Sequence, residues 1–252
     1  MKKKLCITLM AVLAALFAVS TCAVLSYYVQ ARQQEKVYNQ IAKQVQAASE
    51  SEADGFDESE SAILAELVEL YQQNSDLVGW IAIEDTNINY PVVQSVDNPN
   101  FYLKHAFDGS YSIYGCPYVQ ENCDINSSDN CIIYGHHMKN GSMFSDLEKF
   151  KSETFWQEHR TIAFHTLTER AEYELIAVFQ TAVYPNRPDT FRYYGFVNAE
   201  SAEDFAGFID RCKELSLYDT GVTAEYGDKL ITLSTCEYSQ TNGRLVVVAK
   251  KK

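Results

Sequence analysis

The chain has 252 residues, of which 46% are hydrophobic and 22% charged, which suits one domain of ordinary size plus an extra segment. Its net charge of -13 at pH 7 argues against a nucleic-acid-binding protein, because such a protein needs a basic face to neutralise phosphates. Seven cysteines are too few for a scaffold built from disulfides, and 11 glycines with 5 prolines exclude a collagen-like or low-complexity chain.

Residues 1–29 predict cytoplasmic lysines followed by a transmembrane signal-anchor. Lys2–Lys4 precede the uncharged, mostly apolar stretch Leu5–Val29, whose 25 residues exceed the roughly 20 that cross a bilayer. Lysines before the span favour a cytoplasmic N-terminus and an extracellular position for the rest of the chain. The alternatives are a signal peptide cleaved near Ser20 and a lipoprotein site at Cys22. We expect a retained, single-pass membrane anchor, because the apolar character continues beyond both positions.

Residues 30–60 predict a helical stalk and an acidic linker. Gln, Ala and Lys dominate from Gln30 to Ala48 and favour a helix. The stretch from Ser49 to Ser61 is acidic and rich in serine, which is typical of a flexible connection.

Residues 61–252 predict a mainly β domain. A helix from Ser61 to about Gln73 opens it, because apolar residues recur there at helical spacing behind a serine that can cap the helix. Eight later segments are rich in β-branched or aromatic residues and are bounded by turn formers. These candidate strands are Val78–Glu84, Ile88–Gln94, Ile113–Gln120, Cys131–His136, Thr161–Leu167, Glu172–Tyr184, Leu230–Cys236 and Arg244–Lys250. With further helices expected only at Ser142–Phe150 and Ser201–Leu215, the pattern favours a closed or nearly closed β-barrel with helices outside.

The strongest chemical signal is a cysteine, Cys236, at the end of a predicted strand. Asn242 and Gly243 predict a tight turn, after which the next strand begins at Arg244. A hairpin of this kind brings Arg244 back beside Cys236, where a cation favours the thiolate and can stabilise an oxyanion. The structural alternatives are a small buried cysteine and a solvated arginine at the rim.

A second cluster lies at the end of the predicted strand Cys131–His136, where two histidines follow Gly135. Histidine is the usual general acid or base near neutral pH. His136 and His137 could equally be a surface pair, or a soft-metal site together with Met138. Combined with the cysteine and arginine of the hairpin, one histidine would complete a Cys/His/Arg site.

These segments together resemble a sortase of class B. Thr232–Cys236 is similar to the T-L-x-T-C strand of sortases, and Arg244 matches the arginine on the strand that follows. Ile133–Met138, extended through Phe144, resembles the class B histidine segment. The resemblance covers about Asp76 to Lys250, with a departure around Cys116, where many relatives have a Gly-Ser-Ile-Phe-like stretch.

The resemblance implies a sortase-like eight-stranded β-barrel, with an N-terminal helix and an additional helix before the catalytic strand, and the activity of a cysteine transpeptidase. Cys236 would attack the Thr carbonyl of a C-terminal sorting signal and form a thioacyl enzyme. His136 would protonate the leaving amine and then deprotonate the incoming one. Arg244 would hold the substrate backbone and the oxyanion. Neighbouring residues of an extended chain point to opposite faces, and the resemblance selects His136 rather than His137.

The resemblance also suggests substrate contacts. Ser234, Glu237 and Leu103 could touch the sorting signal, although strand-end packing, a solvated carboxylate and core packing are the structural alternatives. The signal would be Asn-Pro-x-Thr-like or related, and the acceptor would be an amine of a peptidoglycan precursor or of a pilin. We expect no cofactor, no metal and no nucleic acid.

The other cysteines of the domain are expected to be buried thiols. Their spacing resembles no zinc motif, and their pairing in disulfides cannot be deduced from the sequence. They are Cys116, Cys123, Cys131 and Cys212.

Two further functions remain open. A cell-surface thiol peptidase would hydrolyse the thioester instead of transferring the acyl group, but the order of histidine before cysteine is unlike papain-type enzymes. A non-enzymatic, membrane-anchored metal or haem-binding protein could use His136, His137 and Met138. It would leave the hairpin of Cys236 and Arg244 without a purpose.

Overall fold

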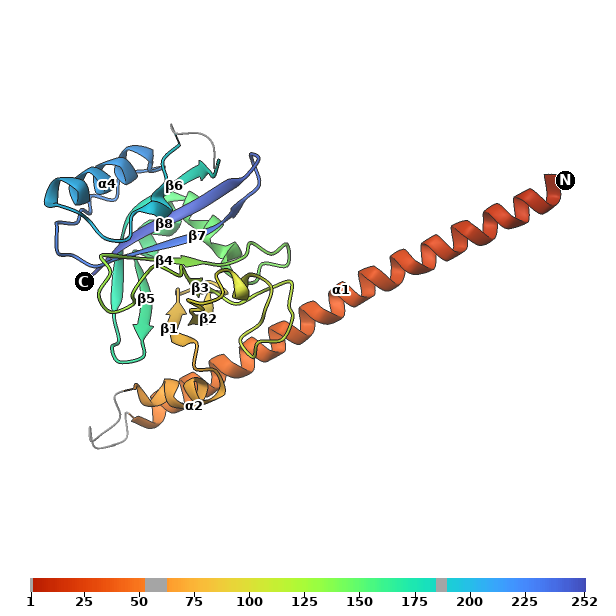
Figure 1. The fold of residues 1–252 in the computed structure, drawn as a ribbon, viewed down its shortest axis with the longest axis horizontal. Helices are drawn as coiled ribbons and strands as arrows, with labels where there is room; N and C mark the ends of the chain where they lie inside the picture. The colour runs from red at the N-terminus through yellow and green to blue at the C-terminus, as the bar shows by residue number, and fades with distance from the viewer. Residues whose placement is uncertain (1, 53–62, 185–189) are drawn as a thin grey trace. The chain divides into compact units, whose positions relative to one another are not determined.

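The computed structural model describes residues 2–52, 63–184 and 190–252 (Figure 1). The chain divides into two compact units, Met1–Ile41 and Ala42–Lys252. Helix α1 (Lys2–Glu52) contains a segment, Leu5–Ser49, that is long and apolar enough to cross a membrane. Its length and composition fit a membrane anchor or a signal sequence.

The expected stalk is helical, and α1 continues through it to Glu52, which is beyond the predicted start of the linker at Ser49. The rest of the predicted linker and the predicted cap Ser61 lie outside the described residues. The next helix, α2 (Ala65–Gln73), covers the second part of the predicted segment and buries Leu67 and Leu70.

Eight strands close into a barrel, as predicted from the sequence (Figure 1). Their order around the barrel is β1-β2-β3-β4-β7-β8-β6-β5, and β5 pairs back with β1. Neighbours are antiparallel except for β2 with β3 and β4 with β7. The strands are β1 (Leu77–Ala82), β2 (Asn89–Val93), β3 (Tyr118–Val119), β4 (Asn130–Tyr134), β5 (Thr161–Thr166), β6 (Glu172–Ala182), β7 (Leu230–Glu237) and β8 (Gly243–Lys251).

Strand β8 carries an unbroken apolar run, Leu245–Ala249, that is fully buried because it is covered on both faces. Helix α4 (Ala202–Leu215) packs over β6 and β8 and forms a cluster with Val246 and Val248 (Figure 1). Its predicted cap is confirmed, since the Ser201 hydroxyl accepts a hydrogen bond from Asp204 N at 3.2 Å. The helix thus lies in the long connection before β7, outside the barrel.

The third strand is much shorter than the predicted Ile113–Gln120. Only Tyr118–Val119 forms β3, because the chain takes a left-handed conformation at Gly115, with φ +63°. A Cβ at Gly115 would collide with the backbone oxygen of Tyr102. The Gly115 turn therefore breaks the β pattern and leaves the preceding residues in a loop beside the barrel end.

The remaining elements are short helices. The predicted helix Ser142–Phe150 is a 3-10 helix, η2 (Phe144–Lys151), followed by α3 (Glu153–Glu158). The 3-10 turns η1 (Phe101–Leu103) and η3 (Tyr193–Gly195) were not predicted. Their three-residue lengths are too short to show a helical period in the sequence.

The four cysteines expected to be buried are all buried thiols. Burial raises the pKa of Cys123, of Cys131 to about 12, and of Cys212. Thiols of this kind stay protonated near neutral pH and do not act as nucleophiles.

Candidate active site

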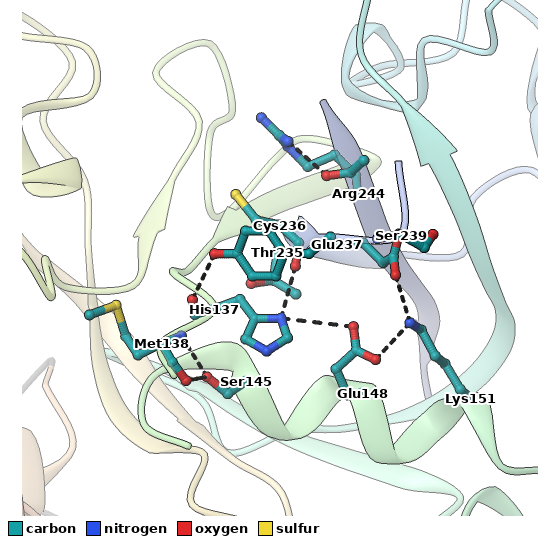
Figure 2. Close-up of polar contacts among 12 residues, drawn as sticks. His137, Met138, Ser145, Glu148, Lys151, Thr235, Cys236, Glu237, Ser239 and Arg244 are labelled. Atoms are coloured by element: carbon teal, nitrogen blue, oxygen red, sulfur yellow. Dashed lines mark hydrogen bonds and ion pairs between the residues drawn. The ribbon is translucent and has the colours of Figure 1, made fainter. Parts of the chain in front are cut away.

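The hairpin of β7 and β8 pairs Cys236 directly with Arg244. Residues opposite each other in an antiparallel pair project from the same face of the sheet, so the predicted neighbourhood of the two residues is present. The turn between them depends on Asn242, with φ +56°, and on Gly243, where a Cβ would collide with the Glu237 carbonyl. The Arg244 guanidinium donates to the carbonyl of Gly243 at 2.8 Å (Figure 2).

The histidine segment is held against the cysteine strand by the parallel pairing of β4 with β7. The register ends at Tyr134 and Ser234, after which Gly135 N donates to Ser234 O at 3.1 Å. Thr235 Oγ1 returns a bond to Gly135 O at 2.8 Å. A Cβ at Gly135 would collide with the Phe144 ring, so this glycine allows the close approach that the sequence predicted.

His136 is the next residue after Gly135. Its Nε2 lies 2.7 Å from the carbonyl oxygen of Leu103. A carbonyl only accepts, so Nε2 carries a proton, and in the neutral imidazole Nδ1 is then the basic nitrogen. The loop of Leu103 therefore fixes the tautomer and the orientation of the ring.

His137 lies on the other side of the strand, as the alternation of an extended chain predicts. Its Nδ1 is 3.0 Å from the carbonyl oxygen of Cys236 and 3.8 Å from Glu148 Oε1. In Figure 2 the Cys236 sulfur points toward the side of Arg244, away from the His137 ring. The two adjacent histidines thus have different partners: His136 bonds to the Leu103 carbonyl and lines the cavity, whereas His137 bonds to the Cys236 carbonyl.

The predicted catalytic residues line one cavity of about 550 Å³. Cys236, His136 and Arg244 all line it, together with Leu103 and Ser234 from the predicted substrate contacts. Several other lining residues were not predicted, and most of them come from loops and strands far from Cys236 and His136 in the chain. These include Asn100, Tyr118, Gln120, Glu121, Asn122, Tyr134 and Tyr194.

The cavity wall is rich in hydroxyl groups that stay protonated. Burial raises the pKa of two lining residues, that of Tyr118 to about 12 and that of Tyr134, and also raises the pKa of Tyr193, which bonds to the lining residue Ser234. Tyr193 and Ser234 share a hydrogen bond of 2.7 Å, and Tyr134 donates to Gln120 Oε1 at 2.5 Å. The wall can therefore offer neutral hydrogen-bonding groups to an extended peptide.

Glu237, the third predicted substrate contact, is not among the residues that line the cavity. Its side chain is 5% exposed, and its carboxylate accepts from Lys151 Nζ at 3.0 Å and from Ser239 N at 3.0 Å. Burial opposes ionisation, but the bonds from Ser239 and Lys151 outweigh it and lower the pKa of Glu237. The structure thus gives this carboxylate a place in the turn that follows Cys236.

The two histidines proposed for metal or haem binding have different partners. His136 bonds to the Leu103 carbonyl, and His137 bonds to the Cys236 carbonyl. Among the residues that the structure describes, no group of three His, Cys, Asp or Glu side chains is placed to hold a metal ion.

Comparisons with known proteins identify the family of this chain. The sortase domain family matches residues 81–252. The chain is 36% identical to sortase B of Listeria monocytogenes over 188 residues, which are 73% of each protein. A Staphylococcus aureus sortase B–substrate complex matches with a TM-score of 0.76 at 27% identity, over 89% of this chain and 98% of the other. A sortase B complexed with triglycine matches with a TM-score of 0.76 at 28% identity, over 88% and 98%.

The barrel and its relatives define the class of protein, which is a cysteine transpeptidase. The chain belongs to the sortase family, and its relatives place it in the sortase B type. The family resemblance stated from the sequence is therefore confirmed, and so is the eight-stranded barrel.

Proposed function

We propose that the protein cleaves a C-terminal sorting signal after threonine and transfers the surface protein to an amine, through a thioacyl intermediate on Cys236. The observation that carries this proposal is the single cavity lined by Cys236, His136 and Arg244. The Cys236 thiolate attacks the Thr carbonyl, and Arg244 donates hydrogen bonds to the oxyanion that forms. As the C–N bond breaks, protonated His136 gives its proton to the leaving amine.

The second half-reaction reverses these roles. The acceptor amine attacks the thioester, His136 removes its proton, and the Cys236 thiolate leaves. An amide replaces the thioester, so no oxidant or external energy source is needed. The bond from His136 Nε2 to Leu103 O supports this assignment, because it leaves Nδ1 to exchange the proton in both steps.

The proposed donor is an Asn-Pro-x-Thr-like or related signal, and the proposed acceptor is an amine of a peptidoglycan precursor or of a pilin. One similar sortase B structure contains a substrate, and a second structure contains triglycine, which carries a free amine. Ser234 and Leu103 are the proposed contacts to the signal, since both line the cavity. Glu237 does not contact the signal in this proposal; its carboxylate holds the turn that follows Cys236.

We also propose a domain arrangement: residues 1–29 anchor the protein with the N-terminus inside, residues 30–60 form the stalk and linker, and residues 61–252 form the extracellular catalytic domain. The lysines before the apolar span support this orientation. External protease on intact cells should release the catalytic domain. Full protection of the domain in such cells would contradict the orientation.

Mass spectrometry tests the activity directly. The enzyme is incubated with a sorting-signal peptide and an amine, and the masses of the protein and of the peptide products are measured. A thioester adduct on Cys236 together with an amine-ligated product supports the transpeptidase. Hydrolysis alone would indicate a thiol peptidase. If neither hydrolysis nor ligation is observed, a binding protein without enzymatic activity is favoured.

A further inference from the structure

The edge of strand β7 changes its hydrogen-bonding partner at the nucleophile. Alternate carbonyls of a strand face the same neighbour, so the carbonyls of Ser234 and Cys236 both face the β4 side. Ser234 O accepts from the backbone of Gly135 at 3.1 Å. Two residues later, Cys236 O accepts from the His137 side chain at 3.0 Å. An imidazole thus continues the ladder at the point where the pairing of the two strands ends.

The direction of this hydrogen bond is determined by its partners. The Cys236 carbonyl and the Glu148 carboxylate, which lies 3.8 Å from the same nitrogen, are both acceptors. His137 Nδ1 must therefore carry a proton. In the neutral state His136 carries its proton on Nε2, so the two neighbouring rings hold opposite tautomers. The basic nitrogen is therefore Nδ1 in His136 and Nε2 in His137.

The His137 contact belongs to a closed ring of polar contacts behind the nucleophile (Figure 2). Glu148 Oε2 lies 2.6 Å from Lys151 Nζ, which lies 3.0 Å from Glu237 Oε1. Tyr238 OH donates to the His137 carbonyl at 3.0 Å, and its ring centroid is 5.1 Å from that of the imidazole. Helix η2 and the histidine segment are therefore tied to the nucleophile's own carbonyl and to the two residues after it.

We propose that His137 is a positioning residue for Cys236. Its Nδ1–H holds the carbonyl of the nucleophile while the sulfur faces the cavity from the opposite side (Figure 2). Without this donor, the last peptide of β7 has lost its ladder partner and can shift. Small displacements of a reacting group lower reaction rates strongly, because the attack needs near-contact geometry. The inference rests on the proposed role of Cys236.

Asparagine separates positioning from proton transfer, because its amide nitrogen reaches the place of Nδ1 and donates but cannot exchange a proton at neutral pH. We compare H137A and H137N in the full-length protein in detergent, measuring kcat and KM with a sorting-signal peptide and an amine. H137A should lower kcat about tenfold, the scale of one lost hydrogen bond, and leave KM within about twofold. H137N should stay within about threefold of the wild-type kcat.

H136N is the matched control at the neighbouring ring. It should lose at least about a hundredfold in kcat, since an amide cannot act as general acid or base. If H137N is as inactive as H137A, His137 does more than donate one bond, and the proposal is wrong. It is equally wrong if H137A turns over at the wild-type rate.

Hydrogen exchange measured by mass spectrometry gives a readout that does not need turnover. Peptides covering residues 236–243 should exchange about tenfold faster in H137A, with recovery in H137N and no change in β6 (Glu172–Ala182). Unchanged exchange in H137A would overturn the proposal. If the wild-type protein transfers no acyl group, the proposed function fails, while the exchange ranking still decides whether His137 holds the hairpin.

Discussion

The two sides of the Cys236 strand differ in chemistry. On the cavity side, His136 and Arg244 are half-buried, and their side chains bond to the backbone carbonyls of Leu103 and Gly243. On the opposite side, His137 and its neighbours form a ring of ion pairs and hydrogen bonds. The side chains proposed to act on the substrate thus bond only to backbone carbonyls, whereas those behind the strand are joined to one another.

This comparison predicts that substitutions on the cavity side abolish chemistry with little effect on folding, while substitutions behind the strand have smaller effects on rate and measurable effects on stability. The variants below test that division, beginning with the largest expected effect.

C236A should abolish both cleavage and ligation without unfolding the domain, because alanine fits a strand end. Turnover is followed by chromatography of the peptide products, and folding by a thermal melt. C212A is the matched control: Cys212 is fully buried against the barrel, so its truncation should lower the melting temperature and spare the chemistry. Substantial turnover by C236A would remove Cys236 from the mechanism.

H136A should lose nearly all activity, and H137A only part of it. His136 lines the cavity with the cysteine, whereas His137 contacts the carbonyl of the cysteine from behind. Steady-state rates of the two variants, each shown to be folded, give the ranking. The reverse ranking would exchange the roles of the two histidines.

R244K tests geometry rather than charge. If Arg244 donates two fixed hydrogen bonds to the substrate carbonyl and the oxyanion, lysine cannot copy the planar guanidinium. We expect a loss of at least about a hundredfold in acyl-transfer rate, the scale of one missing oxyanion donor, with the melt unchanged. A folded lysine variant near the wild-type rate would make Arg244 a simple counter-ion of the thiolate.

The division between the two sides also explains what the sequence could predict. Cys236 and Arg244 come together through a local hairpin, whose turn residues and register are visible in a single short stretch of the chain. Ser234 has the same strand parity as Cys236 and lines the cavity, while its predicted contact with the sorting signal stays a prediction. Glu237 is the next residue along the strand, so alternation turns it to the opposite face, toward Lys151.

The cavity wall was harder to predict, because it depends on contacts between distant segments. Glu121 and Tyr194 reach the cavity through the closure of the barrel and not through any local motif. The third strand was too long in the prediction, since a β-like composition hid the left-handed turn at Gly115. Local patterns therefore selected the candidate catalytic residues, and the closure of the barrel decided which other side chains surround them.

The smallest expected effect concerns stability and pH behind the strand. The bonds from Ser239 and Lys151 outweigh burial and lower the pKa of Glu237, so its ionised form stabilises the native state. A carboxyl with a lowered native pKa contributes stability above its unfolded pKa, and that contribution is lost as the pH falls through the native value. For Lys151, burial lowers the pKa, but bonds to Glu148 and Glu237 raise it overall, so its contribution disappears only at strongly alkaline pH.

E237Q should therefore be less stable than the wild type at pH 7 by roughly 1.5 kcal/mol, the low end of the range for one hydrogen bond to a charged group. The difference in melting temperature should shrink as the pH is lowered from 7 to 3, because the wild-type carboxyl then also becomes neutral. E172Q is the control, since the pair of Glu172 with Lys252 is more than half exposed on both sides and should contribute little. A difference for E237Q that is constant from pH 7 to 3 would show that the carboxylate charge does not hold the turn behind Cys236.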